Sequence, residues 1–412
     1  MTSLNRNTSV LIATFSVWKK EKRTSLNGNV EPLLDFFVPK VKRTVLIDQP
    51  YPGSDMVMPR IEVYEKGKKS AIFRSSALLY LLYPFLKIVN YHDTHPSFKI
   101  RDFFSIIDWC LRDTTVFDYF IGLEAANAMA GIFLRKFGKI KKVIYYVSDY
   151  SPQRFRIGII NTLYLWLDRF CASHADFIWD VSKAMQPARI KAGLEEEESA
   201  RALHVPNALY PVQIKTESMS KIVPFSLVFM GTLGVENGPD IAVEALPIVL
   251  RKFPKTILHI IGGGKEDVDR LQKLAEKLKL KEKVVLHGFI ANREKVSEAI
   301  RIFYVALAPY PFIEGSPRLY GDATKIRAYL AAGLPVITTH IPPLGKEAAG
   351  KGAAILVGDN SEAFAKAIIQ VFSSRNLYLR LRKNAIRFAK NNTWENEFAK
   401  AFEDMERIAQ NL

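Results

Sequence analysis

The residues with the clearest chemical potential lie in one stretch, residues 309–339, which reads PYPFIEGSPRLYGDATKIRAYLAAGLPVITT. Asp322 is placed to cap a helix, and Thr324 and Lys325 fall in the first turn of that helix. Gly333 then ends the helix before a short apolar strand. Backbone N–H groups, a hydroxyl and an ammonium group would converge at one point, where an anion can bind. The alternative is an ordinary capped helix with a lysine on its surface.

Two glycine-rich turns come before this stretch and have a related character. In FMGTLGVENGPD a buried run ends at Gly231 and a helix follows. In IIGGGKEDVDR three adjacent residues, Gly262, Gly263 and Gly264, lie directly before a helix. Glycine lets the backbone approach a phosphate closely, and three in a row cost more conformational entropy than a turn requires. These turns indicate phosphate contacts, although a purely structural turn would use the same residues. The spacing is not that of a dinucleotide-binding fingerprint.

These candidate residues must be held by strands that end beside them. Short apolar runs bounded by polar turns recur through the second half of the chain, with helical patterns at 239–253 and 265–278 between them. Strict alternation of strand and helix predicts βαβ units, a parallel sheet and right-handed crossovers. The expected strands are residues 225–231, 256–262, 283–289, 304–310, 334–339 and 352–358.

The first half repeats this pattern less regularly. Its apolar runs are continuous, as parallel strands buried on both faces require. Near residues 204–225, Pro, Ser, Thr and Lys replace the apolar periodicity, which indicates a domain boundary. The sequence therefore predicts an α/β protein of two doubly wound domains that face a cleft. The expected strands of the first half are residues 9–16, 43–50, 116–124, 141–149 and 175–182.

The composition sets outer limits on the class of protein. The chain has 412 residues, of which 48% are hydrophobic and 24% charged, as in a globular protein of two domains. A formal net charge of +16 favours phosphorylated ligands, polyanions or anionic lipid, but no nucleic-acid-binding module is recognised. Two cysteines without a Cys/His cluster argue for a reduced compartment and against structural zinc. The N-terminus does not read as a signal peptide and the apolar stretch 77–89 is too short to span a bilayer, so we expect a cytoplasmic protein.

Taken together, these motifs resemble those of nucleotide-sugar-dependent glycosyltransferases of the GT-B fold, specifically family 4. KIRAYLAAGLPVITT resembles the Lys-x-x-x-Tyr-Leu-Ala-Ala-Gly-x-Pro-Val signature of that family. LVFMGTLGVENGPDIAVEAL, HIIGGGKED and VVLHGFIANREKVSEAI match further landmarks in order and spacing. The resemblance covers nearly all of residues 226–373 and is looser in the first half. It implies two Rossmann-like domains, an acceptor domain (1–205) and a donor-binding domain (225–390), joined by a linker (206–224). A C-terminal helix (391–412) would cross back to the first domain.

The resemblance also implies roles for residues of both domains. The candidate catalytic residues are Lys325, Asp149 and Glu314. Donor binding is expected at Gly231, Thr232, Asn237, Gly262, Gly263, Gly264, Gly288, Asp322 and Thr324. The expected acceptor-side residues are Asn27, Gly28, Asn29 and Arg154. No metal ion and no cofactor are expected, because the nucleotide-sugar is a substrate.

The sequence departs from the family pattern where that pattern carries positive charge. Thr232 and Asn237 stand where the family commonly has an Arg and a Lys that hold the donor diphosphate. Lys325 and the glycine backbones would then have to neutralise more of the diphosphate, with Arg318 as a helper.

The paired glutamates of the family pattern are also absent. Tyr320 and Ala328 occupy their positions, and Glu314, in a longer loop, is the candidate to replace the first. The missing charged residues favour an alternative function, a non-catalytic GT-B protein that binds a sugar nucleotide or a glycan.

We nevertheless expect an enzyme of glycan biosynthesis that moves a sugar from a nucleotide-sugar to a glycan or lipid-linked acceptor, with retention of configuration. The basic clusters of the first half lie near the apolar stretch and favour peripheral contact with an anionic membrane at its inner face, with a solvated basic face as the alternative. These clusters are residues 19–23, 40–43, 66–69 and 135–142.

Overall fold

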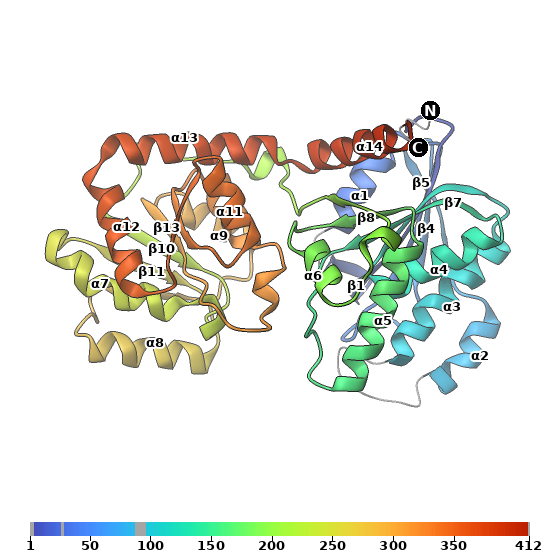
Figure 1. Cartoon of the computed structure of the whole chain (residues 1–412), viewed down its shortest axis with the longest axis horizontal. Coiled ribbons are helices and arrows are strands. Elements are labelled where there is room, and N and C mark those ends of the chain that lie inside the picture. The colour runs from blue at the N-terminus through green and yellow to red at the C-terminus, as the bar shows by residue number, and fades with distance from the viewer. Residues whose placement is uncertain (1–3, 26–28, 87–95, 411–412) are drawn as a thin grey trace. The chain divides into compact units, whose positions relative to one another are not determined.

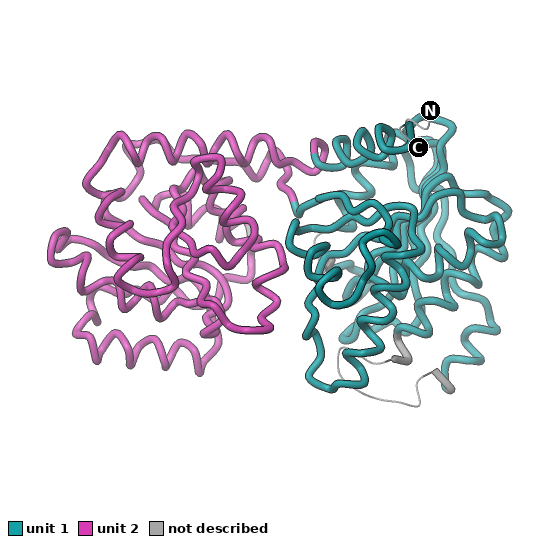
Figure 2. The backbone as a smooth tube through the Cα atoms, in the orientation of Figure 1, with its two compact units in different colours: residues 1–207, 397–412 teal, residues 208–396 magenta. Residues whose placement is uncertain are grey.

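The computed structural model of the chain describes residues 4–25, 29–86 and 96–410. The chain forms two compact units, which Figure 2 shows in different colours. Unit 1 comprises residues 1–207 and 397–412, and unit 2 comprises residues 208–396. The change from unit 1 to unit 2 therefore falls inside the stretch 206–224, and the chain returns to unit 1 within its last helix.

Unit 1 is built on a mixed sheet whose centre is parallel. Its strands are β1 (Ser9–Lys19), β2 (Lys22–Ser25), β3 (Arg43–Pro50), β4 (Arg60–Glu65), β5 (Lys68–Phe73), β6 (Phe117–Leu123), β7 (Ile140–Val147), β8 (Phe177–Asp180) and β9 (Arg201–His204). The strand order is β5-β4-β3-β1-β6-β7-β8-β9, and β2 pairs with β1. The pairs from β3 across to β9 are parallel, whereas β2, β4 and β5 pair antiparallel with their neighbours.

Helices cover both faces of this sheet (Figure 1). They are α1 (Val30–Phe37), α2 (Ala77–Leu86), α3 (Pro96–Arg112), α4 (Ala125–Lys136), α5 (Gly158–His174), α6 (Met185–Lys191) and α14 (Trp394–Gln410), with a 3₁₀ turn η1 (Glu196–Glu198). Tyr119 and Phe120 are neighbours on β6 and point to opposite faces. Phe402 of α14 packs on Tyr119, while Gly131 of α4 lies directly against Phe120. Phe398 of α14 also stacks on Trp179 of β8, which ties the last helix to unit 1.

Unit 2 has a parallel sheet in the order β12-β11-β10-β13-β14-β15. The strands are β10 (Ser226–Met230), β11 (Ile257–Ile261), β12 (Val284–Gly288), β13 (Val305–Ala308), β14 (Val336–Thr339) and β15 (Ala354–Val357). The helices are α7 (Pro239–Lys252), α8 (Lys265–Lys277), α9 (Arg293–Ile300), α10 (Thr324–Ala331), α11 (Pro343–Gly350), α12 (Ser361–Ser373) and α13 (Arg375–Asn391), with 3₁₀ turns η2 (Pro211–Gln213), η3 (Val235–Asn237) and η4 (Pro317–Leu319).

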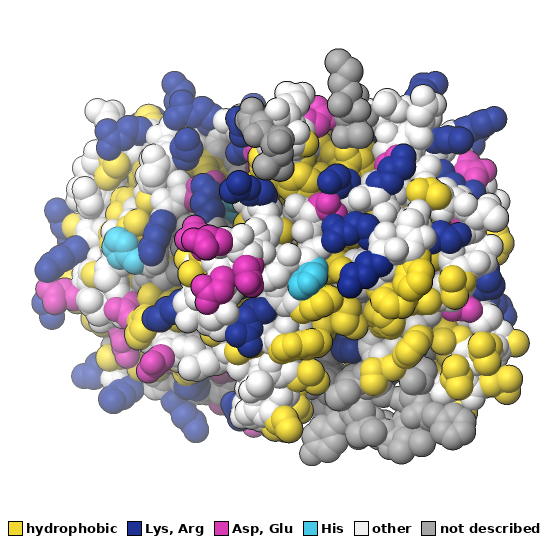
Figure 3. Space-filling model, turned by 45° about the vertical axis from the view of Figure 1, so that its right-hand side comes forward, with side chains coloured by type: hydrophobic (Ala, Val, Ile, Leu, Met, Phe, Trp, Pro, Cys, Tyr) yellow, Lys and Arg dark blue, Asp and Glu magenta, His cyan; other side chains and the backbone are white. Residues whose placement is uncertain are grey.

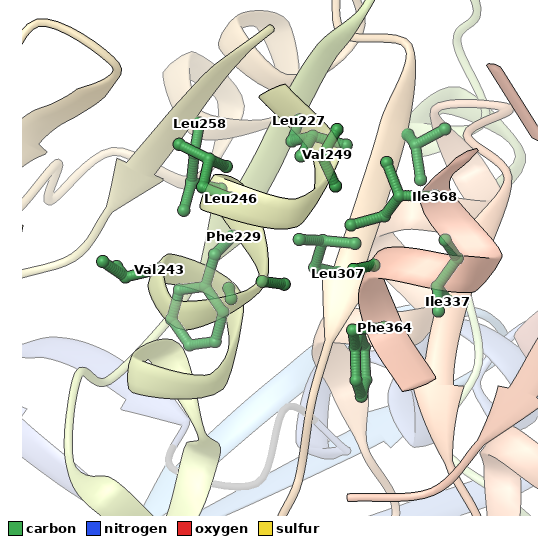
Figure 4. Packing of buried hydrophobic residues seen from close by; sticks show 14 of the residues in the cluster. Leu227, Phe229, Val243, Leu246, Val249, Leu258, Leu307, Ile337, Phe364 and Ile368 are labelled. Atoms are coloured by element: carbon green, nitrogen blue, oxygen red, sulfur yellow. The ribbon is translucent and has the colours of Figure 1, made fainter. Parts of the chain in front are cut away.

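The strands of unit 2 bury side chains on both faces, which explains their continuous apolar sequences. Leu227 and Phe229 of β10 face the core under α7 and α12, shown in Figure 4, whereas Val228 faces the core under α10 and α11. Leu307 of β13 and Phe364 of α12 fill the first of these cores. The result is a sheet with a helix layer on each side.

The predicted α/β fold with two Rossmann-like domains is confirmed, and the strands expected from apolar runs are present within a few residues of their predicted bounds. The edge hairpin of β4 and β5 was not predicted. Strand β5 carries Lys68 and Lys69 and is largely exposed, so it has no apolar pattern to detect. None of the helices in the residues described here is long and apolar enough to cross a membrane.

Candidate active site

Unit 2 places its candidate residues at the point where the order of its strands reverses. From β10 the chain moves outward through β11 and β12, then returns to the other side of β10 and continues through β13, β14 and β15. In open α/β sheets ligands bind at the carboxyl ends of the strands beside such a point. Gly231 follows β10 and Tyr310 follows β13, so their loops meet there.

Lys325 is the central side chain at this edge. It is the second residue of α10, and only 9% of it is exposed. Its Nζ lies 4.2 Å from the ring centroid of Phe229 and 4.9 Å from that of Tyr310. Within the residues described, this Nζ has no hydrogen-bond partner. Because buried polar groups in folded proteins are almost always hydrogen-bonded, an amine left open at this position indicates a site prepared for an anion.

The surroundings of Lys325 also affect its ionisation. The pKa of the amine is lowered to about 7, mainly by burial and also by the nearby charge of Arg318, while Glu236 opposes the shift. The arrival of a negatively charged group beside Nζ would favour the protonated amine and reverse this shift. The amine can therefore respond strongly to a developing negative charge.

The glycines around Lys325 are needed for close approach. A Cβ added at Gly231, where φ is +128°, would lie 3.2 Å from Cε and 3.3 Å from Nζ of Lys325. A Cβ added at Gly262 would lie 2.2 Å from the carbonyl oxygen of Gly231. Gly264 has a φ of +113° directly before α8, and Gly288 has a φ of +73° at the end of β12. The backbones of these loops are thus brought to one edge of the sheet, as the sequence indicated.

Thr232 and Asn237 lie at the same edge and contact each other. The amide nitrogen of Asn237 donates to Thr232 Oγ1 at 2.7 Å and to Glu236 Oε1 at 2.9 Å. Asn237 is buried and Thr232 is exposed. The positions where the family commonly has two cations therefore hold a neutral, internally hydrogen-bonded pair.

The predicted role of Asp322 as a helix cap is wrong. Ala323 is the N-cap residue of α10, without a side-chain capping bond, and Asp322 instead pairs with Arg327, whose Nε lies 2.9 Å from Oδ2. Both side chains are buried, and a buried guanidinium without a carboxylate would be far more costly than an uncapped helix end. Thr324 is exposed at the first turn of α10, and Glu314 is exposed in the preceding loop.

The candidate residues of unit 1 form a second group. Asp149 follows β7, and its Oδ2 lies 3.0 Å from Nη1 of Arg154, which also donates to the backbone oxygen of Asp149 at 2.5 Å. Asn29 is buried at the start of α1, and within the described part of the chain its side-chain amide has no hydrogen-bond partner. Asn27 and Gly28 lie outside the described residues.

Comparison with known proteins identifies the fold. Residues 223–388 match the family model described as "Glycosyl transferases group 1". HepE from Anabaena in complex with UDP is 16% identical, with a TM-score of 0.63 over 96% of this chain and 100% of that chain. Sucrose-phosphate synthase from Thermosynechococcus elongatus is 14% identical (TM-score 0.65, 99% and 100% covered), and OtsA in its apo form is 12% identical (TM-score 0.66, 97% and 99% covered). The chain has the GT-B fold. No curated protein matches it at a significant level.

Three residues of this GT-B chain were missed by sequence reasoning. Tyr310 is buried against Lys325, and Phe289 is 76% exposed beside Gly263, where an added Cβ would lie 2.6 Å from that of Phe289. Glu124 follows β6 and has a φ of +65°, a conformation that residues other than glycine rarely adopt. Each is the last residue of a strand expected from the sequence, and that position is the signal that could have drawn attention to it. In the described part of the chain, no cluster of three or more His, Cys, Asp or Glu side chains is arranged to hold a metal ion.

Proposed function

We propose that the protein is a glycosyltransferase, similar to family 4, that transfers a sugar from a nucleotide-sugar held by unit 2 to a glycan or lipid-linked acceptor held by unit 1. The observation that carries the proposal is the buried amine of Lys325, which lacks a hydrogen-bond partner among the described residues and lies over the glycine loop after β10. The match of residues 223–388 to glycosyl transferases group 1 and the UDP bound by HepE support a nucleotide-sugar donor.

The chemistry follows from charge that develops on the leaving group. When the bond between sugar and diphosphate breaks, the diphosphate gains negative charge and the sugar gains oxocarbenium character. A protonated Lys325 in a site with little water would stabilise that charge more strongly in the transition state than in the ground state. The glycine loops would let backbone N–H groups approach the same phosphates. Asp149 and Glu314 remain the proposed further catalytic residues.

The proposed reaction retains anomeric configuration and requires no metal ion, as the resemblance to family 4 implies. Proton NMR of the product formed during the first turnovers would report the configuration. Activity that survives EDTA would agree with metal-independent transfer, whereas activity restored only by a divalent cation would contradict it.

The first experiment is a panel of UDP-, GDP- and ADP-sugars, with thermal stabilisation and release of free nucleotide measured in the same samples. Stabilisation together with release would identify the donor and support a transferase. No response to any donor would contradict the proposed function of the edge around Lys325.

A non-catalytic sugar-nucleotide or glycan-binding protein is the second candidate. The hydrogen bond between Asn237 and Thr232 favours it, since this neutral pair replaces two cations of the family pattern. Stabilisation by a nucleotide-sugar without nucleotide release, even when acceptors are present, would select this candidate.

Peripheral contact of unit 1 with an anionic membrane is part of the proposal. Leu78 and Leu81 of α2 are 65% and 71% exposed, and hydrophobic side chains gather on the part of unit 1 that is turned forward in Figure 3. The basic clusters contribute less charge than their sequence suggests. Arg43, Arg135 and Lys142 each pair with a carboxylate. Sedimentation with vesicles of anionic and of neutral lipid would measure the charged and the apolar contributions to binding. Absence of the protein from the pellets of both kinds of vesicle would contradict the membrane contact.

A further inference from the structure

Unit 1 contains a pocket of about 660 Å³, a volume typical of sites for small molecules. The pocket lies at the carboxyl ends of the central strands, since its lining includes Phe15 of β1, Glu124 directly after β6 and Asp149 after β7. The chain runs from β1 to β3 on one side and later continues through β6 on the other, so this is the point where the strand order of unit 1 reverses. The pocket therefore occupies the position in unit 1 where a ligand is expected.

The walls of the pocket are mostly apolar and come from helices. Phe103 of α3, Met129 of α4 and Leu167 of α5 line it, together with Leu163 and Trp166 of α5. Leu163 and Trp166 are also 54% and 53% exposed, so the apolar lining continues to the surface of the protein. Sugars bind through many hydrogen-bonding groups, and these walls offer few of them. A hydrocarbon chain suits them, because the transfer of its CH₂ groups from water to apolar surroundings is favourable.

Charged side chains meet this apolar lining on the side of the strand ends. Arg154 and Asp149 form an ion pair, whereas Lys99 of α3 has no ion pair with any carboxylate in the described residues. Its Nζ lies 5.5 Å from the ring centroid of Phe15, which also lines the pocket. The charge of Lys99 acts on the carboxyl of Glu124, but among the described residues the two side chains form no ion pair, so the ammonium can still contact an anion.

Glu124 completes this charged side in an unusual way. Its carboxyl accepts a hydrogen bond from Ser148 Oγ at 2.7 Å. Burial raises the pKa of this carboxyl, and the charges of Arg154 and Lys99 and that hydrogen bond oppose the shift. The strained backbone of Glu124 is the kind of local cost that proteins retain at functional positions.

We propose that this pocket binds an amphipathic lipid, with its hydrocarbon chain between α3, α4 and α5 and a phosphate-type head group beside Lys99 and Arg154. This inference rests on the proposed function in one respect only. If the protein is a glycosyltransferase, the lipid is its acceptor, and the head group carries the group that is glycosylated. Lipid binding itself can be tested without any glycosyl transfer.

The test uses decyl phosphate, decanol and inorganic phosphate as probes, at concentrations where the amphiphiles stay monomeric, with the full chain in a titration calorimeter. We expect decyl phosphate to bind at least tenfold more tightly than decanol, and inorganic phosphate alone not to bind measurably. Lys99→Gln should weaken the binding of decyl phosphate about five- to tenfold and leave the affinity for decanol unchanged. Equal affinity for decyl phosphate and decanol would overturn the assignment of the head group.

A matched pair of variants on α5 tests where the hydrocarbon chain of the lipid binds. Leu163→Glu places a carboxylate in the lining of the pocket and should weaken the binding of decyl phosphate at least tenfold. Ile159→Glu, one turn earlier, changes a side chain that is 79% exposed and not part of the lining, so affinity should stay within twofold. Both positions are exposed enough for the variants to fold, which circular dichroism would check. No binding of decyl phosphate to the unmodified protein, or equal losses in both variants, would overturn the proposal.

The two proposals fail in different ways. Decyl phosphate binding without release of nucleotide from any nucleotide-sugar would leave the lipid pocket standing and contradict the transferase. Nucleotide release without decyl phosphate binding would leave the transferase standing and point to an acceptor that is not a lipid.

Discussion

In unit 2 the switch point between β10 and β13 is lined by glycine backbone and one buried amine, whereas in unit 1 the switch point between β1 and β6 opens into a pocket of aromatic and aliphatic side chains. In both sheets the candidate site lies at the carboxyl ends of the strands. The difference lies in which elements fill that edge, since tight glycine loops leave room for backbone contacts and long helices contribute apolar walls. The fold determines where a ligand lies, and the loops and helices determine its chemistry.

The largest expected effect follows from removal of the Lys325 amine, which tests the polar character of the unit 2 edge. We expect Lys325→Met to reduce turnover about 100- to 1,000-fold, the range found when one donor to a developing negative charge is removed. Lys277→Met is the matched control, because Lys277 is exposed in the last turn of α8, at the end of the helix away from the glycine loop. Steady-state kinetics with the best donor would measure both. Unchanged turnover in Lys325→Met would remove the central assignment.

The same substitution should stabilise the ligand-free protein. The folded state lowers the pKa of Lys325 from 10.5 to about 7, which corresponds to at most about 5 kcal/mol of unfolding free energy at about 1.4 kcal/mol per pKa unit. Between these two values the unfolded chain binds more protons than the folded protein, so the stability of the unmodified protein rises with pH across that window. The unfolding free energy of Lys325→Met should therefore exceed that of the unmodified protein by about 2–4 kcal/mol below pH 7, and this difference should fade towards pH 10.5.

Urea unfolding of both proteins at pH 6, 8 and 10 would measure this difference. A variant less stable than the unmodified protein at every pH would show that the amine has a stabilising partner in solution. Higher stability with lower turnover would be the expected exchange of stability for function at a prepared site.

A smaller effect should follow from adding one methyl group to the glycine loops. Gly262→Ala would place Cβ 2.2 Å from the carbonyl oxygen of Gly231, so the loop after β10 must shift. We expect a loss of about 1–3 kcal/mol in unfolding free energy and weaker donor binding. Gly350→Ala is the control, since nothing lies within 4 Å of its added Cβ in the helical end of α11, and it should be neutral or slightly stabilising. Equal stability of the two variants, measured by thermal unfolding, would show that the loops are not tightly packed.

Much of the polar edge could be predicted from the sequence, because its determinants are local. Parallel strands buried on both faces appear as continuous apolar runs, and the glycines and Lys325 follow such runs directly. The role of Asp322 could not be predicted in the same way. A capping carboxylate and a buried ion pair to Arg327, five residues later, are equally compatible with the sequence, and only burial decides between them.

The apolar pocket could not be predicted, because its lining comes from segments far apart in the chain. Ile100 of α3, Met129 of α4 and Leu163 of α5 each read as ordinary core positions of amphipathic helices. Their convergence depends on how three helices pack over one sheet. The strained backbone at Glu124 is likewise a tertiary property, since its sequence context shows only a polar residue between a strand and a helix.

The smallest effect concerns Phe289, which brings an aromatic surface to the otherwise polar edge of unit 2. Its ring is 76% exposed directly after β12, beside the glycine loop that ends at Gly264. An exposed aromatic side chain next to the proposed phosphate-binding loops would be placed to stack on the base of the proposed nucleotide-sugar, and such stacking is worth about 1–3 kcal/mol per base. We expect Phe289→Ala to weaken binding of the nucleotide-sugar about 5- to 30-fold, at the lower end of that range, with little change in thermal stability. Phe137→Ala, which removes a similarly exposed ring from unit 1, should leave nucleotide affinity unchanged. Equal affinities of the two variants in calorimetry would show that the base lies elsewhere and that the edge of unit 2 recognises the diphosphate and sugar alone.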